Sequence, residues 1–262
     1  MTEPAACARL EALDLAGHRV PHGRQQNLGA IAKLCQGEPF YTFGIHRVAA
    51  ALRDPGLSET AVLRATAAVT GCSPDPTLRQ GPGYIAPLAT VTGLRHLADA
   101  LAQAARQGQR VAFGTGHPGC LLGLWQPLAA WVGQAGAEVV CGPIGQPVGP
   151  GQFTDALGGV GVVSDSAGLL HTHGHQAGDA LLQSQRVALF CGDHGWAGAA
   201  VNAGVPCVAI MDTNDPGLAV ALALGAPALT LVPMGDNAPN AWMGEVATWV
   251  MRRAEGQPGP LD

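Results

Sequence analysis

The chain has 262 residues, of which 47% are hydrophobic and 13% charged, and its formal net charge is -5. This composition is typical of a globular protein with a sizeable core and excludes an intrinsically disordered chain. Aromatic residues make up only 5%, and residues 111–251 contain a single basic residue, Arg186, so we expect no nucleic-acid partner.

The first 107 residues are expected to form a helical N-terminal region that caps the rest of the chain. Gly37 stands where a helix-ending glycine belongs, and Ser58 is a favoured residue for a helix start. The proline-rich connection 71–88 is long, and we expect it to be held against another part of the chain. The predicted helices cover residues 5–16, 27–36, 43–53, 58–70 and 89–107.

Neither a targeting segment nor a membrane span is expected. The N-terminal segment has charges throughout and lacks the apolar core of a signal peptide. The uncharged stretch 217–234 is broken by Gly225 and Pro227, which predicts a buried helix, a turn and a strand. The seven cysteines form no CxxC pair and are expected to be reduced, as in a cytoplasmic protein.

From residue 108 onward, short apolar strands alternate with helices. Continuous apolar strands of this kind predict an α/β fold with a doubly wound, mostly parallel sheet in a Rossmann-like three-layer arrangement over residues 108–262. Pro127 is expected either to kink the first of these helices or to begin a second one. The strand segments lie within 110–116, 138–142, 160–166, 186–195, 205–215 and 228–237.

Polar residues recur where these strands end. In an open α/β sheet, ligands bind in the crevice at the carboxyl ends of the strands. Any single one of these residues could instead cap the following helix, but the set together predicts a binding site. The strand-end segments are 114–117, 164–166, 193–194, 212–215 and 235–237.

Two motifs bear on what such a site binds. In "HTHGH", an extended backbone would place His171, His173 and His175 on one side, as metal ligands would be, whereas a loop leaves their direction open. "GTGHPG" at residues 114–119 has the GxGxxG pattern of dinucleotide sites, but the next strand ends without the acid that would hold a ribose. We interpret this loop as a set of backbone amides that cradle a phosphate or carboxylate.

A phosphate bound in this acidic half of the chain needs positive charge. Helix N-termini, protonated histidine, a divalent metal ion, or Arg24 and Arg79 from the first part could supply it. The clustered Asp and His residues favour a metal ion.

Five of these segments, in order, resemble a bacterial family common in actinobacteria whose members are named as phosphatases. They are "GTGHPGCLLGLW", "LLHTHGHQAGDALL", "GDHGWAGAAVNAGV", "DTNDPGLAVA" and "PMGDN", and the likeness continues upstream in "RQQNLGAIAKLCQGEPFYTFG" and "DPTLRQGPG". "PMGDN" departs from the pattern, which has a second acid and a histidine there, so Asp236 and Asn237 are left out of the predicted site. The matching positions are Arg24, Asn27, Arg79, Thr115, His117, His171, His173, Asp193, His194, Trp196, Asp212, Asn214 and Asp215.

The hypothesis is a metal-assisted phosphatase that acts on a small phosphorylated metabolite, with a possible homo-oligomeric state. A metal-free sugar-phosphate isomerase, a nucleotide-cofactor enzyme and a small-molecule-binding protein are the alternatives. The predicted catalytic residues are His194, Asp193 and His117; the predicted phosphate ligands are Arg24, Asn27, Arg79, Thr115, Gly116 and His117. The predicted ligands of a divalent ion (Mg, Mn or Zn) are Asp193, Asp212, Asp215, His171 and His173.

Overall fold

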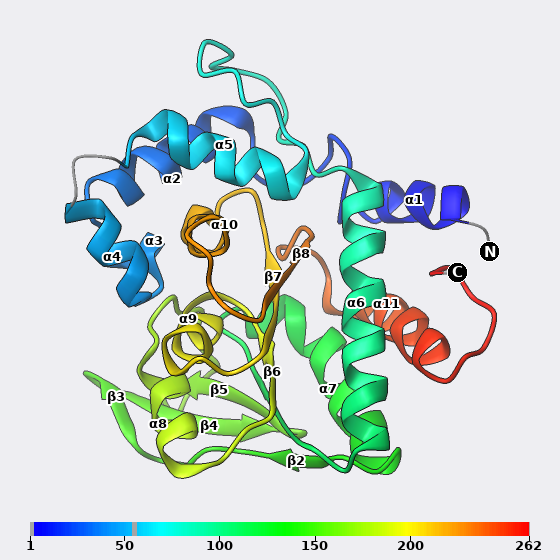
Figure 1. Cartoon of the computed structure of the whole chain (residues 1–262). Helices are drawn as coiled ribbons and strands as arrows, with labels where there is room; N and C mark the ends of the chain where they lie inside the picture. The colour runs from blue at the N-terminus through cyan, green and yellow to red at the C-terminus, as the bar shows by residue number, and fades with distance from the viewer. Residues whose placement is uncertain (1–2, 54–56, 262) are drawn as a thin grey trace.

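The computed structural model describes residues 3–53 and 57–261, and a mixed sheet runs through its centre (Figure 1). Within these ranges the sheet has eight strands in the order β3-β4-β5-β1-β6-β7-β8, and β2 pairs with the first half of β1. The strands are β1 (Arg110–Gly114), β2 (Glu138–Val140), β3 (Pro147–Gly149), β4 (Gln152–Leu157), β5 (Val160–Ser164), β6 (Leu189–Gly192), β7 (Cys207–Met211) and β8 (Leu229–Pro233).

Most of the strand pairs are parallel, as predicted. Strands β1, β2, β5, β6, β7 and β8 run in one direction, whereas β4 pairs antiparallel with β5, and β3 with β4. The sequence did not predict the β3–β4 hairpin. Strand β3 has three residues, including a proline and a glycine, and β4 lies near the sheet edge with mixed polar and apolar residues, so neither carries the apolar run of a central strand.

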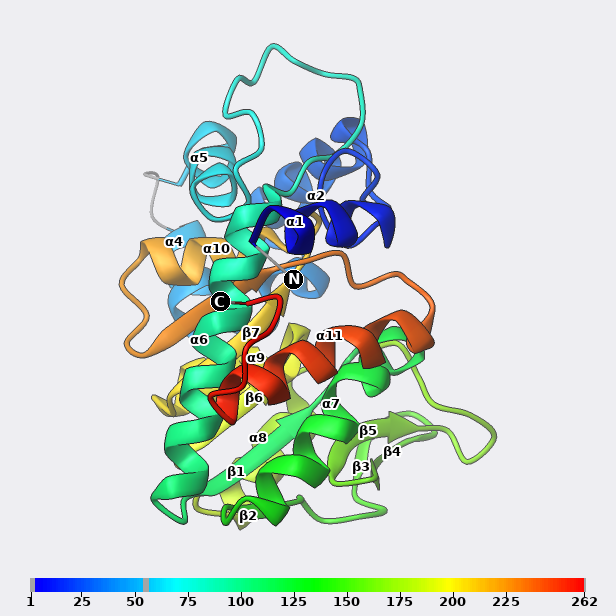
Figure 2. The same ribbon diagram turned by 90° about the vertical axis from the view of Figure 1, so that its right-hand side faces the viewer.

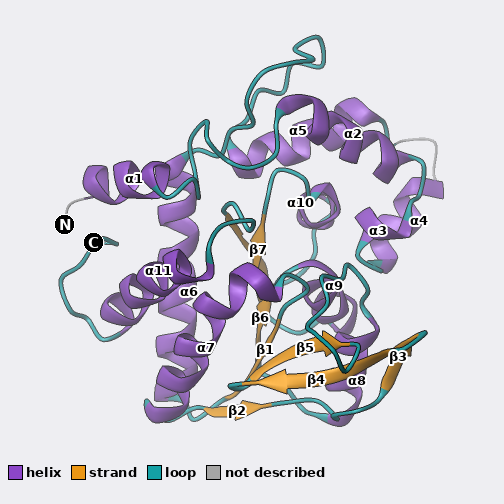
Figure 3. Cartoon of the chain, turned by 180° about the vertical axis from the view of Figure 1, so that it is seen from behind, coloured by secondary structure: helices purple, strands orange, loops and turns teal. Residues whose placement is uncertain are grey.

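Helices cover both faces of the sheet, which confirms the predicted fold class (Figure 3). One face carries α6, α7 and α11, the other α8, α9 and α10, and helices α2 to α5 lie over α10 (Figures 1 and 2). The helices are α1 (Glu3–Ala12), α2 (Arg24–Cys35), α3 (Pro39–Thr42), α4 (His46–Arg53), α5 (Glu59–Thr70), α6 (Pro87–Arg106), α7 (Pro118–Gln134), α8 (Gln176–Ser184), α9 (His194–Ala203), α10 (Pro216–Ala223) and α11 (Asn240–Ala254).

The helical N-terminal region packs on the sheet domain in two places. Buried residues of α1 and α6 belong to the hydrophobic cluster on one face of the sheet, with α7 and α11. Buried residues of α2 to α5 belong to the cluster on the other face, with α9 and α10. Helices α2 to α5 therefore cover the side of the sheet that carries α9 and α10.

Local signals in the sequence set several helix ends. The Ser58 hydroxyl accepts a hydrogen bond from the Ala61 amide, and Gly71 ends α5 with a φ of 74°. Pro127 lies inside a single continuous helix, α7, so it does not begin a second one. The stretch 217–234 forms α10, a turn and β8, as predicted, and all seven cysteines are free.

The sheet reverses its strand order at β1. The chain places β5 on one side of β1 and then crosses to place β6 on the other. A crevice forms at such a switch point because the two flanking connections leave in opposite directions. The loops that follow β1, β5 and β6 therefore meet at this end of the sheet.

Candidate functional site

A cavity of about 300 Å³ lies at the carboxyl ends of the parallel strands. It is lined by residues that follow β1, β5, β6, β7 and β8, together with two from the N-terminal region, and none of these described lining residues is Lys or Arg. The lining residues are His22, Phe40, His117, His171, His173, His194, Asp212, Asn214, Asp215, Asp236 and Asn237. We call the five histidines and three aspartates among them, with Asp193 behind them, the His/Asp cluster.

His194 lies at the centre of this cluster and is almost fully buried. It begins α9 with a φ of 45°, a left-handed conformation that costs a non-glycine residue about 1–3 kcal/mol. Its Nδ1 lies 3.1 Å from the Asp193 carboxylate, and its Nε2 lies 3.4 Å from Asp215 and 3.3 Å from Asp236. Burial opposes a charge on His194, but these carboxylates together raise its pKa well above the usual range.

Asp193 and Asp215 occupy the N-cap positions of α9 and α10, yet neither side chain makes a capping hydrogen bond. Asp193 Oδ2 instead accepts a hydrogen bond from the Gly116 amide, and Asp215 Oδ2 accepts one from the Asp212 amide. The alternative that these residues serve as helix caps is therefore wrong. Their side chains link the loops after β1, β6 and β7.

His173 and His171 enter the cavity from the segment between β5 and α8. The Nδ1 of His173 lies 2.9 Å from the Phe40 carbonyl oxygen, which can only accept, so this nitrogen carries the proton and Nε2 keeps its lone pair. Burial and the neighbouring imidazoles lower the pKa of His173 to about 2 and that of His171 to about 4. Both rings are therefore neutral and able to act as ligands. His175 points elsewhere and pairs with Asp179 at 2.6 Å.

The carboxylates of the cluster repel one another. Burial and the adjacent charges of Asp236 and Asp215 raise the pKa of Asp212 well above its usual range. Asp212 Oδ2 and Asp193 Oδ1 are buried and have no hydrogen-bond partner among the described residues. Oxygen atoms with free lone pairs and like charge in a buried site are suited to a bound cation.

The predicted anion cradle after β1 is already engaged in the structure. The Gly116 amide donates to Asp193, and the His117 amide donates to the Thr115 hydroxyl, which is itself buried. A Cβ atom on Gly116 would lie 2.1 Å from the carbonyl oxygen of Thr172, so only glycine fits there. Both amides are therefore hydrogen-bonded within the protein, and neither is free to bind a phosphate in the predicted cradle. His117 itself reaches the cavity, where its Nδ1 lies 3.3 Å from Asp236.

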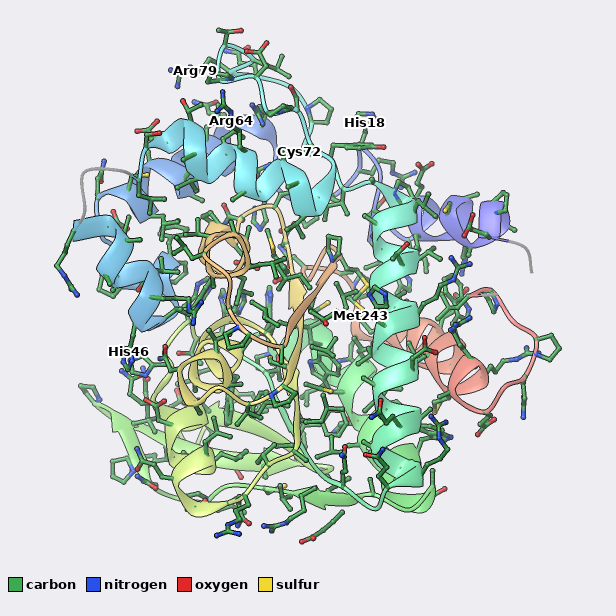
Figure 4. The ribbon with its side chains drawn as sticks, in the orientation of Figure 1. His18, His46, Arg64, Cys72, Arg79 and Met243 are labelled. Carbon is green, nitrogen blue, oxygen red and sulfur yellow. The ribbon has the colours of Figure 1, made fainter. Side chains whose placement is uncertain are left out.

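The predicted arginine ligands do not reach the cavity. Arg24 is buried, and its guanidinium donates to three carbonyl oxygens of the loop at residues 73–78, with distances of 2.6 to 2.9 Å. It holds the long loop in place, which corrects the expectation that it binds phosphate. Arg79 is exposed on the same loop at the outer edge of the molecule (Figure 4). Asn27 accepts a hydrogen bond from the Thr213 hydroxyl beside Asp212 and does not line the cavity.

Two cluster residues were not among the predicted site residues. Asp236 was set aside because its segment departs from the family pattern, yet it is buried and faces both His117 and His194. Its position just after β8, at the same edge as the other strand ends, was the signal that could have kept Asp236 among the predicted site residues. His22 comes from the loop before α2 and lies 3.4 Å from Asp212 Oδ2. No sequence pattern marks it as a site residue.

Three sets of residues have ligand atoms that all lie within 4.8 Å of one another. They can hold a metal ion, because imidazole nitrogen and carboxylate oxygen are ordinary ligands of divalent metals. The sets are His117, His171 and His194; His173, His194 and Asp215; and His22, Asp212 and Asp236.

A buried His/Asp cavity at the switch point of a doubly wound sheet defines an α/β enzyme with a polar active site. Comparison with known proteins gives the family. The family model described as Phosphatase matches residues 2–257. The chain is also 36% identical to the protein named Phosphatase SCO2771 from Streptomyces coelicolor. The match extends over 223 residues, which is 82% of this chain and 81% of that protein. No solved structure matches the chain.

The chain therefore belongs to the phosphatase family, which confirms the resemblance found in the sequence. Membership makes it a hydrolase whose substrate is phosphorylated. Among the described residues, no helix has both the length and the apolar character needed to cross a membrane.

Proposed function

We propose that the chain is a metal-assisted phosphatase that hydrolyses a small phosphomonoester in the cavity. His173, His194 and Asp215 would hold a divalent ion. The observation that carries this proposal is that the ligand atoms of these three buried side chains lie within 4.8 Å of one another, and each side chain has a neighbour on its other side. Metal-binding histidines in proteins almost always donate their other ring nitrogen to a carbonyl or carboxylate.

These partners leave His173 Nε2, His194 Nε2 and Asp215 Oδ1 close together, and His173 Nε2 also lies 3.1 Å from His171 Nε2. A bound cation would displace the proton that the raised pKa of His194 places on its ring. Phe40 holds Nδ1 of His173 through its carbonyl oxygen, and Asp193 lies against Nδ1 of His194. Asp215 accepts the Asp212 amide at Oδ2, so its Oδ1 is left to face His194 Nε2. The donor set therefore has two imidazole nitrogens and one carboxylate oxygen. Such a set suits Zn²⁺ or Mn²⁺ better than Mg²⁺, which prefers oxygen ligands and bound water.

A divalent ion in this set, when bound, polarises a phosphoryl oxygen and lowers the pKa of a water molecule. The protein must bind the ester so that its phosphorus lies over the buried floor of the cavity. His117 and His171 lie nearer the mouth, stacked at 4.4 Å between ring centroids, where they can hold the ester and pass a proton to its leaving oxygen. A cavity of about 300 Å³ favours a small substrate.

The lack of basic side chains around the cavity supports a metal requirement. The dianionic phosphate of the substrate would enter a site that already holds four aspartates, and no lysine or arginine lines it within the described residues. Protonated His194 and His117 supply part of the positive charge, and the buried carboxylate oxygens without a hydrogen-bond partner favour an added cation for the rest. The seven free cysteines support the reducing, cytoplasmic location that the sequence predicts.

The test is thermal unfolding and phosphate release by chelator-treated protein, after addition of Zn²⁺, Mn²⁺ or Mg²⁺ and with or without inorganic phosphate. We expect Zn²⁺ or Mn²⁺ to raise the Tm by several degrees, phosphate to raise it further, and the same ion to restore hydrolysis of p-nitrophenyl phosphate. His173→Ala should abolish the restored hydrolysis and reduce the rise in Tm. His46→Ala, an exposed histidine outside the cavity, is the matched control (Figure 4). Full hydrolysis by metal-free protein would refute the proposal.

A further inference from the structure

We infer that the cavity holds a second metal ion, bound by His22, Asp212 and Asp236. This inference rests on the proposed function, because it adds a second ion to the metal site described above. The ligand atoms of these three residues lie within 4.8 Å of one another, and none of the three belongs to the set of His173, His194 and Asp215. The remaining set, with His117 and His171, shares His194 with the first site and competes with it. No residue of one set is therefore needed by the other.

The Asp212 carboxylate is prepared for a ligand role. Its Oδ1 accepts a hydrogen bond from the amide of Thr213, and the Thr213 hydroxyl lies 3.2 Å from the same oxygen and 3.0 Å from Asn27 Oδ1, with one proton to donate to either. The side chain is therefore fixed from behind by Thr213. Its Oδ2 is buried without a hydrogen-bond partner among the described residues, and His22 Nε2 lies 3.4 Å from it. An unpartnered buried carboxylate oxygen beside an imidazole is costly unless a cation occupies the space.

Asp236 stands between the two proposed sites. Its Oδ2 lies 3.3 Å from His194 Nε2, and the residue also belongs to the set with His22 and Asp212. A carboxylate has two oxygens and can contribute to both ions, as in two-metal hydrolytic centres.

The carboxylates of the cavity agree with a second ion. Three aspartates line it, with Asp193 behind them, and no lysine or arginine is among the described lining residues. Two divalent ions would neutralise these carboxylates more fully than one, and each would displace the protons that its ligands carry when the ion is absent. A dianionic phosphate would then enter a site with positive charge close to it.

The experiment counts metal ions on the full chain. Chelator-treated protein is incubated with Mn²⁺, separated from free metal by gel filtration, and analysed by mass spectrometry of the metal and by electron paramagnetic resonance. We expect two Mn²⁺ per chain and the spectrum of a spin-coupled pair. His22→Ala should bind one Mn²⁺ and lose the coupling, and so should His173→Ala from the other side. His18→Ala, an exposed histidine four residues before His22, should still bind two (Figure 4).

The outcomes separate the two proposals. One Mn²⁺ in the unaltered protein, retained by His22→Ala and lost from His173→Ala, would overturn the second site and leave the metal-assisted phosphatase standing. No bound Mn²⁺ or Zn²⁺ together with full phosphate release would overturn the proposed function itself. Asp212→Asn provides a second variant of the site, since it is close to isosteric, and it should also bind one ion.

Discussion

Replacement of Asp193 by Asn tests whether the residue behind His194 controls metal binding. Both contacts of the Asp193 side chain involve one oxygen, Oδ2, which accepts the Gly116 amide at 3.0 Å and lies 3.1 Å from His194 Nδ1. An Asn oxygen can take the same place. The substitution therefore removes the negative charge and keeps the shape, which makes His194 a weaker ligand without displacing it.

The expected loss follows from the behaviour of such supporting residues. Replacing a residue that orients a metal-bound histidine costs about 10–100-fold in metal affinity or activity. That range corresponds to about 1.4–2.7 kcal/mol, at about 1.36 kcal/mol for each factor of ten. We expect Asp193→Asn to bind Mn²⁺ or Zn²⁺ more weakly by this factor and to lose turnover at a fixed metal concentration, while the metal-free variant stays folded.

The assay is a competition between the protein and a chelator of known affinity, followed by measurement of kcat/KM for p-nitrophenyl phosphate. Circular dichroism of the metal-free variant checks that it is folded. Asp179→Asn is the control, because Asp179 also pairs with a histidine, His175, at 2.6 Å but does not line the cavity. If Asp193→Asn had the metal affinity and kcat/KM of the unaltered protein, Asp193 would have no part in orienting His194.

Two further predictions concern arginine contacts. Arg24→Met should lower the free energy of unfolding by about 2–4 kcal/mol, because three carbonyl oxygens lose a charged donor, whereas Arg79→Ala should change neither stability nor KM. Urea denaturation measures the stability of each variant, and substrate titration measures its KM. A raised KM with unchanged stability in Arg24→Met would contradict the structural role of Arg24. The Arg9 guanidinium lowers the pKa of Glu245, so this exposed pair should contribute a small stabilisation above pH ~4.3 and lose it as the pH falls through the lowered pKa. Glu245→Gln should therefore be less stable than the unaltered protein at pH 7, and the difference should shrink as the pH falls below about 4.3. A difference that does not shrink with falling pH would count against the ion pair.

The fold could be predicted because its central strands are continuous apolar runs. All five residues of β7, for example, are buried, and the polar residues that follow it mark the end of the strand at the ligand-binding edge. This pattern also located most of the His/Asp cluster, since strand ends of a parallel sheet meet at one edge. It could not reveal the β3–β4 hairpin, because β3 has only three residues at the sheet edge and both strands are mostly partly buried or exposed.

The roles of individual side chains were harder to predict, because they depend on partners that are distant in sequence. Arg24 stands beside a glycine, as a phosphate-binding arginine could, but the loop at residues 73–78 takes its guanidinium. Asp236 differs from the family pattern, but its position at the end of β8 still brings it to His194. Position in the sheet predicted membership of the site more reliably than motif identity did.

The alanine- and glycine-rich sequence of α9 explains how the N-terminal region reaches this site. A Cβ atom on Gly198 of α9 would lie 2.1 Å from the carbonyl oxygen of Phe43, and one on Gly217 of α10 would lie 2.2 Å from that of Tyr41. The two glycines thus allow the backbone around α3 to lie directly on both helices. This close approach brings the Phe40 carbonyl to His173 and fixes its tautomer. The cavity is therefore completed by the docking of a segment that the sequence alone assigns only to a cap.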